Sequence, residues 1–290
     1  MKRLRPLLLL LPLTGCLQKP PHPAIRYTVG APYQADGIWR YPRAEFSYDA
    51  TGIAAVYSGR HARFTADGER YSPEAFAAAH PTLQLPAIAR ITNLENGWQI
   101  VLRINDRGPA DPARILAVTP RVASLLGFSP GGTARVRVQV LPGPSQALAL
   151  SLPGGPTLAV SLAPIRRVAV SALPPLPGAY SAEGPAHSAR PSPEAAQTAP
   201  PPGPAPGTLS EVAPAPDELW VRTGLFTSQR YAALQAASLG RFGAAMAPRY
   251  GSGALQVEVR VGPFATISEA DAMLKEVLRA GVPGARLVAE

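Results

Sequence analysis

The chain has 290 residues, enough for two domains of ordinary size that each bury a core. Its 28 lysines and arginines against 19 acids give a formal net charge of +9, which indicates an anionic partner or reflects composition alone. A single cysteine excludes an internal disulfide. No phosphate-binding loop, Gly-x-Ser-x-Gly motif or metal-ligand cluster occurs in the sequence, which disfavours nucleotide-binding, serine hydrolase and metalloenzyme functions.

The amino terminus has the pattern of a secretory signal. Three basic residues, Lys2, Arg3 and Arg5, precede the apolar run LLLLLPL, which is too short to span a bilayer. Residues 13–16 (LTGC) resemble a bacterial lipobox, which implies cleavage before Cys16 and its lipidation; an ordinary cleaved signal with an incidental cysteine is the alternative. Leu17 in place of an aspartate implies the outer membrane, facing the periplasm. We expect residues 17–50 to be a tether.

This location narrows the choice of anionic partner. A lipid-anchored chain outside the cytoplasm does not meet nucleic acid, so no nucleic-acid partner is expected. Cell-wall glycan with carboxylated stem peptides and anionic lipid head groups are the polyanions present there.

Short apolar elements separated by turn signals then indicate a mainly β, barrel-like domain over residues 51–142. An Asn-Gly pair between apolar runs is the strongest short hairpin signal, and Ser or Thr before Pro marks a helix start. The predicted elements are, in chain order, a short helix over 73–79 after Ser72-Pro73, a hairpin over 86–105 around Asn96-Gly97, a helix between Thr119 and Gly127, and an alternating strand over 134–141.

Three titratable residues of this domain stand at turns or element ends. Glu69 follows an Asp-Gly turn, His80 ends the run AAAH, and Asp106 ends an apolar strand in RINDRGP. A carboxyl group in a barrel mouth can protonate a glycosidic oxygen and later take a proton back, provided that burial or a neighbouring carboxylate raises its pKa. Taken singly, each residue also has a structural interpretation: Asp106 and Glu69 as turn residues, and His80 at a helix end.

The motifs GIAAVYSGRHARFTADGERY, AAAHPTLQLP, ITNLENG and VLRINDRGP together resemble the double-psi β-barrel of the rare lipoprotein A (RlpA) family, in order over residues 51–142. The resemblance implies a lytic transglycosylase with no metal or cofactor. Its substrate would be peptide-free peptidoglycan strands at the division septum, where septal proteins are further candidate partners. It also implies that Glu69, His80 and Asp106 are catalytic.

Two positions depart from the pattern of that family. Val56 stands where an aromatic residue is usual, and Ala117 stands where an aspartate is usual. The missing carboxyl at Ala117 puts activity in doubt. A non-catalytic glycan-binding scaffold at the septum is therefore the alternative to an enzyme.

Proline dominates the next segment. Residues 143–217 hold 17 of the 35 prolines, which break helices and sheet ladders and predict an extended linker. Residues 146–172 are apolar enough to add strands to the barrel, which is the alternative for that part.

Residues 218–290 contain an internal repeat, VRTGLFTS and VRVGPFAT, and a helical pattern follows each copy. The order strand, helix, strand, strand, helix, strand predicts an α+β ferredoxin-like domain with both helices on one face of the sheet. The segment resembles the SPOR domain, which implies binding to peptide-free peptidoglycan. Strand alternation and the repeat place the candidate glycan-binding residues on the open face: Trp220, Arg222, Gln256, Glu258 and Arg260. A core position at the sheet edge is the alternative for Trp220.

Overall fold

The computed structural model describes residues 23–57, 64–129, 132–157, 205–215, 218–251 and 254–290. Cys16 and most of the proline-rich segment lie outside these ranges, so the structure leaves the lipid anchor as a prediction. Within them, no helix is long and apolar enough to cross a membrane.

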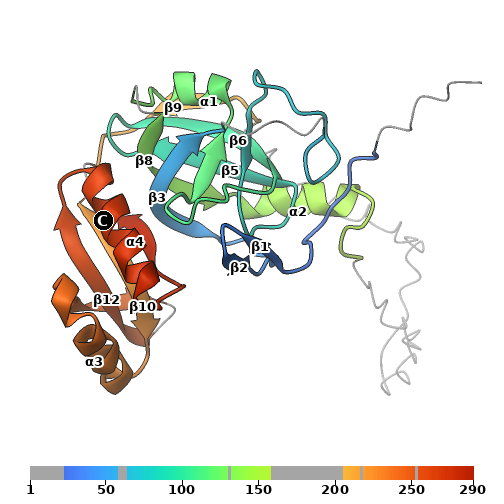
Figure 1. Ribbon diagram of the computed structural model, residues 1–290. Coiled ribbons are helices and arrows are strands. Elements are labelled where there is room, and N and C mark those ends of the chain that lie inside the picture. The colour runs from blue at the N-terminus through green and yellow to red at the C-terminus, as the bar shows by residue number, and fades with distance from the viewer. Residues whose placement is uncertain (1–22, 58–63, 130–131, 158–204, 216–217, 252–253) are drawn as a thin grey trace, which may run out of the picture.

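Six of the described strands close into a barrel of mixed direction, as predicted (Figure 1). The order β4-β7-β3-β8-β5-β6 is closed by a pairing between β4 and β6. The β3–β7 and β4–β6 pairs are parallel, and the others are antiparallel. The strands are β3 (Asp49–Val56), β4 (Ala77–Ala79), β5 (Ala87–Asn93), β6 (Trp98–Asp106), β7 (Leu116–Val118) and β8 (Thr133–Val140).

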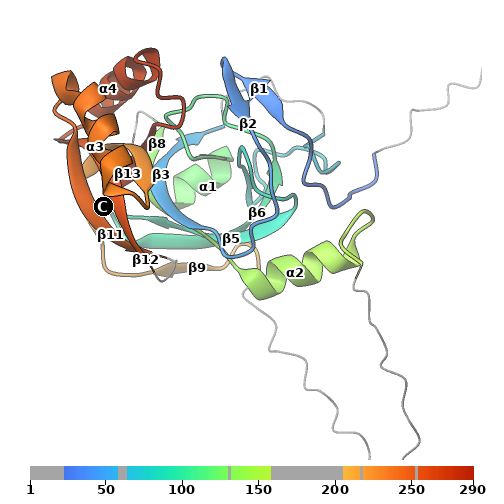
Figure 2. The ribbon, with the colours of Figure 1, turned by 90° about the horizontal axis from the view of Figure 1, so that it is seen from below.

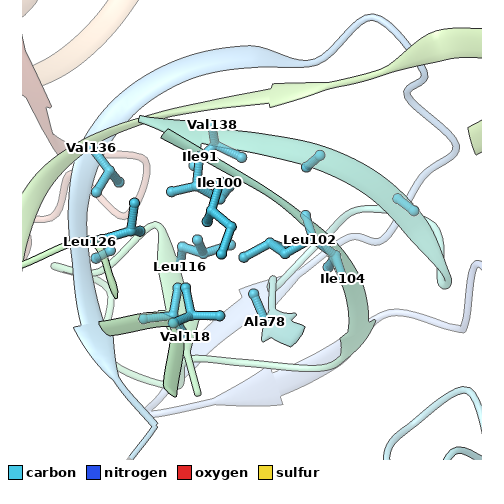
Figure 3. Close-up of a cluster of buried hydrophobic side chains, with 14 of the residues drawn as sticks. Ala78, Ile91, Ile100, Leu102, Ile104, Leu116, Val118, Leu126, Val136 and Val138 are labelled. Carbon is cyan, nitrogen blue, oxygen red and sulfur yellow. The ribbon is translucent and has the colours of Figure 1, made fainter. Parts of the chain in front are cut away.

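The barrel interior is filled by aliphatic side chains from every strand (Figure 3). On β6 the alternating residues Ile100, Leu102 and Ile104 are fully buried, as the period of two predicts. Helix α1 (Pro120–Leu125) is the predicted helix after Thr119, and it ends before Gly127 in the left-handed conformation, φ +64°.

Other expectations about the barrel are wrong. Residues 73–79 form no helix: their last three residues are strand β4, buried between β6 and β7, because tertiary pairing overrides the helix propensity of alanine. The expected tether holds a hairpin, β1 (Tyr33–Ala35) and β2 (Ile38–Arg40), whose turn residues Asp36 and Gly37 both have positive φ.

Both described ends of the expected linker pack on the barrel. Helix α2 (Pro142–Ser151) lies beside β5, and the hydroxyl of Ser145 bonds both backbone groups of Ile88 at 3.0 Å. Strand β9 (Leu209–Glu211) pairs with the start of β6 (Figure 2). The alternative was that residues 146–172 add strands to the barrel. The part of this segment that the structure describes, residues 146–157, forms the end of helix α2 and a turn instead.

The C-terminal domain has the predicted ferredoxin-like topology. Four described strands form an antiparallel sheet in the order β11-β12-β10-β13, with α3 and α4 packed against it (Figure 2). Its elements are β10 (Leu219–Phe226), α3 (Gln229–Ser238), a 3-10 turn (Gly240–Phe242), β11 (Ala245–Gly251), β12 (Ala254–Phe264), α4 (Ile267–Arg279) and β13 (Arg286–Ala289).

The two domains are in direct contact. Arg114 of the barrel donates two hydrogen bonds of 2.7 Å to the carboxylate of Asp271 on α4. Ile53, on the outer side of β3, is fully buried in the apolar cluster of the C-terminal domain, next to Leu287. A Cβ at Gly52 would lie 3.3 Å from the Leu287 carbonyl oxygen, so a glycine permits this close approach. The domains therefore share a packed interface.

Candidate functional site

A small pocket of about 40 Å³ opens beside the ends of β4, β6 and β7. Two of the three predicted catalytic residues, Glu69 and Asp106, line it together. Ala117, the position where an aspartate was expected, lines the same pocket from β7. A carboxyl group at position 117 would therefore have entered the site formed by the other two.

Asp106 is held by three hydrogen bonds. Its Oδ1 accepts the backbone N–H groups of Ala66 and Arg107 at 3.0 and 2.8 Å, and its Oδ2 accepts the Tyr57 hydroxyl at 3.1 Å. Burial, with Asp106 as the next cause, raises the pKa of Tyr57 to about 12, so this phenol keeps its proton at neutral pH. The Arg107 side chain turns away to the carbonyls of Leu83 and Val29, as the opposite faces of adjacent strand residues predict.

Glu69 is fixed by residues of β6. Its Oε1 lies 2.8 Å from Arg103 Nη2, and its Oε2 accepts the side-chain amide of Asn105 at 2.5 Å. The preceding turn requires Gly68, with φ +96°, because a Cβ there would lie 2.7 Å from the carbonyl oxygen of Ala24. Sequence reasoning missed Arg103 and Asn105, although both stand in the same RINDRGP run as Asp106.

Asp67 is a further acid that sequence reasoning treated only as a turn residue. Its side chain has no exposed surface, and its Oδ1 accepts the Thr65 hydroxyl at 2.6 Å and the Glu69 backbone N–H at 3.1 Å. Burial raises its pKa to about 6, against the hydrogen bonds that lower it. Asp67 therefore shapes the turn that presents Glu69 and carries a proton in mildly acidic solution.

Aromatic side chains and a second depression extend the site. The rings of Tyr57 and Tyr71 lie 5.5 Å apart beside the pocket, and such rings are suited to stacking on sugars. A larger cavity of about 380 Å³ adjoins the pocket and shares Tyr57 and Ala117 with it. The pocket of the two carboxyl groups and the larger cavity therefore lie side by side, with Tyr57 and Ala117 lining both. Tyr57 adjoins the position where Val56 replaces the expected aromatic residue.

The structure does not bring His80 into this pocket. Its backbone N–H donates to the Asp106 carbonyl oxygen at 3.0 Å, but its ring is buried on another side, edge-on to Tyr48. The ring Nδ1 accepts the backbone N–H groups of Thr82 and Leu83, both at 3.1 Å. Burial first, and then neighbouring arginines, lower its pKa to about 3, so the ring is neutral.

The predicted glycan-binding residues do gather on the open face of the C-terminal sheet, where the Arg260 guanidinium stacks 3.9 Å above the Trp220 ring. Arg222 and Glu258 lie on the same face but are buried and ion-paired at 2.7 Å, and Glu290 and Arg249 extend that network. Gln256 lies opposite Arg249 at the β11 side. Trp220, Gln256 and Arg260 are therefore the partly exposed members of this set.

The described residues contain no group of three or more His, Cys, Asp and Glu side chains that could hold a metal ion. The polar groups that line the pocket include two carboxyl groups, two phenols, the guanidinium group of Arg70 and the amide of Asn105.

Comparisons with known proteins support the barrel fold of the N-terminal domain. A family model described as "Lytic transglycolase" matches residues 49–138. The chain is 47% identical over 108 residues to the protein named endolytic peptidoglycan transglycosylase RlpA of Neisseria meningitidis serogroup A, covering 37% of this chain and 44% of that one. Proteins of the same name from Rickettsia felis and Pseudomonas aeruginosa (strain UCBPP-PA14) are 35% and 36% identical, over 46% of this chain and 62% and 44% of theirs.

Each of these matches covers less than two thirds of the relative's length. The family model ends at residue 138, before helix α2, so this match covers the barrel and not the C-terminal domain. The closed six-stranded barrel that carries Glu69 and Asp106 is therefore similar to the double-psi β-barrel of the RlpA proteins.

Proposed function

We propose that the barrel is an endolytic lytic transglycosylase that cleaves peptidoglycan glycan strands and leaves 1,6-anhydromuramic acid ends. The observation that carries this proposal is the convergence of Asp106 and Glu69 on one pocket. The names of the relatives and of the matching family model support the same reaction.

The two carboxyl groups have different surroundings, which supports different roles for them in the proposed reaction. Glu69 lies 2.8 Å from the Arg103 guanidinium and has the role of the electrostatic partner. Asp106 Oδ2 meets the Tyr57 hydroxyl, which can donate to it or accept from it. A proton on Oδ2 therefore keeps its hydrogen bond, and Asp106 is the proton carrier.

The reaction proceeds in two proton transfers. Asp106 first gives its Oδ2 proton to the glycosidic oxygen as the bond from that oxygen to the muramic acid C1 breaks. The carboxylate of Glu69 stabilises the positive charge that develops at C1. The 6-hydroxyl of the same sugar then attacks C1 and forms the anhydro ring, and Asp106 takes the hydroxyl proton. The enzyme is restored without a water molecule.

The pocket and the larger cavity fit cleavage inside a strand. The larger cavity adjoins the catalytic pocket at Tyr57 and Ala117 and offers room for sugar units beyond the reacting bond. The neighbouring rings of Tyr57 and Tyr71, tilted by 31° to each other, supply the apolar surface that sugar faces contact.

We further propose that the C-terminal domain is a SPOR-type module that binds peptide-free glycan through Trp220 and Arg260, and that a lipid on Cys16 anchors the protein to the outer membrane at the septum. The ferredoxin-like topology and the open face with its stacked pair support the binding role. Radiolabelled palmitate in the parent chain but not in Cys16→Ser tests the anchor, and pull-down of amidase-treated glycan by the parent chain but not by Trp220→Ala tests the module.

The activity is tested by incubating the full chain in detergent with amidase-treated peptidoglycan and measuring anhydromuramic ends by mass spectrometry. Asp106→Asn and Glu69→Gln should each lower the yield at least a hundredfold, the usual contribution of general acid-base catalysis being about 10²–10⁴. Asp49→Asn and Glu276→Gln, exposed ion-paired acids away from the pocket, are the matched controls.

The second candidate is a glycan-binding protein without catalysis, which the apolar side chain of Ala117 in the pocket wall favours. Absence of anhydro ends from the parent chain, with glycan still bound, would establish that candidate and refute the transglycosylase.

A further inference from the structure

A cleft between the two domains is lined by four arginines. It has a volume of about 220 Å³ and lies between the barrel and the start of β13. Arg40, Arg43 and Arg114 come from the barrel side, and Arg286 comes from the C-terminal domain. This arginine cleft shares no lining residue with the pocket of Asp106 and Glu69.

The positive charge of the arginine cleft is only partly neutralised. Arg114 is paired with Asp271, and Arg43 lies 2.8 Å from Glu45. Across the ranges that the structure describes, no acid forms an ion pair with Arg40 or Arg286. Two guanidinium groups therefore face the same space without a counter-charge.

Two buried N–H groups in the lining also have no partner. His80 is 2% exposed, and because its Nδ1 accepts backbone hydrogen bonds, its Nε2 carries the proton of the neutral ring. That Nε2 and the Nε of Arg40 have no hydrogen-bond acceptor among the described residues. Buried donors without acceptors are rare in folded proteins, so both N–H groups can donate to an acceptor that enters the cleft.

We propose that the arginine cleft is a binding site for a carboxylate anion. A carboxylate has two oxygens that can each accept several N–H groups, and guanidinium groups bind it in a two-point geometry. The neutral imidazole of His80 adds a donor without adding a charge. The ligand would contact Arg40 and His80 on the barrel and Arg286 on β13, so it would bridge the two domains.

The cell wall offers this chemistry in two forms, the lactyl carboxylate of muramic acid and the free carboxylates of stem peptides. This choice of ligand rests on the proposed function. The carboxylate site itself rests on the unpaired donors and is independent of that function. A strand bound in the catalytic pocket with one carboxylate in the arginine cleft would be held at two separate points.

Isothermal titration of the full chain in detergent tests the proposal. The probes are N-acetylmuramic acid, N-acetylmuramoyl-L-alanyl-D-isoglutamine and, as the sugar without a carboxylate, N-acetylglucosamine. Arg286→Gln and Arg40→Gln should each weaken carboxylate binding about tenfold, the effect of losing one charge-assisted hydrogen bond. Arg137→Gln, an exposed arginine paired with Asp49 on β3, is the control and should bind as the parent does.

Each outcome has a definite meaning. Binding of N-acetylmuramic acid supports the lactyl carboxylate, and binding of the muramoyl dipeptide alone supports a stem-peptide carboxylate. Equal binding of N-acetylglucosamine, no binding of either acid, or unchanged affinity in both arginine variants would overturn the proposal. Because no turnover is measured, a chain that binds the acids but releases no anhydro ends retains this site and loses the transglycosylase function.

Discussion

The buried carboxyl group of Asp67 should make the stability of the barrel fall as pH rises. The folded-state pKa is about 6, and the ordinary value is 3.8. For a raised pKa, the favourable contribution is complete below pH 3.8 and is lost as pH rises through 6. These two values give a loss of about 2 kcal/mol between pH 4 and pH 7.

The variant Asp67→Asn isolates this effect. Its amide oxygen can still accept from Thr65 and Glu69, but it does not titrate, so the variant should gain about 2 kcal/mol relative to the parent between pH 4 and pH 7. Urea unfolding followed by circular dichroism at several pH values measures the difference. Asp49→Asn should change in the opposite direction, because Arg137 lowers the pKa of Asp49. A difference between Asp67→Asn and the parent that is constant with pH would refute the reasoning.

Three further results are expected. His80→Asn keeps a side-chain acceptor in the place of Nδ1 and removes the buried imidazole. Because the pKa of that imidazole is about 3, the parent should lose about 2 kcal/mol of stability between pH 7.5 and pH 5, and the variant should not. An equal loss of stability in the variant, measured by urea unfolding, would contradict this. Ala117→Asp should lower stability by about 1–3 kcal/mol and give no additional anhydro ends, so a rise in their yield would show that the missing carboxyl limits catalysis. Arg114→Gln should weaken domain docking by about 1.5–3 kcal/mol and speed hydrogen exchange in α4, whereas Arg137→Gln should leave that exchange unchanged.

The elements that local signals specify were the predictable ones. The hairpin around Asn96-Gly97, the helix after Thr119 and the repeat of the C-terminal domain all follow from turn chemistry and periodicity. The same kind of signal, Asp36-Gly37 between short strands, marks the hairpin β1–β2 in the segment interpreted as a tether.

Features set by distant contacts could not be read from the sequence. Ala77 to Ala79 have no strand propensity, and only their neighbours β6 and β7 make them a strand. His80 was grouped with Glu69 and Asp106 on motif spacing, but spacing does not state on which side of the barrel a ring lies. The unusual pKa of Asp67 depends on complete burial, which the sequence of a turn does not reveal.

Strand β9 changes what the proline-rich segment can do. The chain leaves the barrel after helix α2 and returns to it at residues 205–211, so both ends of the intervening stretch are fastened to the same domain. The backbone N–H groups of Val212 and Ala215 still donate to barrel carbonyl groups, and β10 begins at Leu219, so the connection to the C-terminal domain is short. Shortening or lengthening the stretch between residues 158 and 204 would therefore leave the distance between the two domains unchanged. The length of this stretch does not set the spacing of the domains.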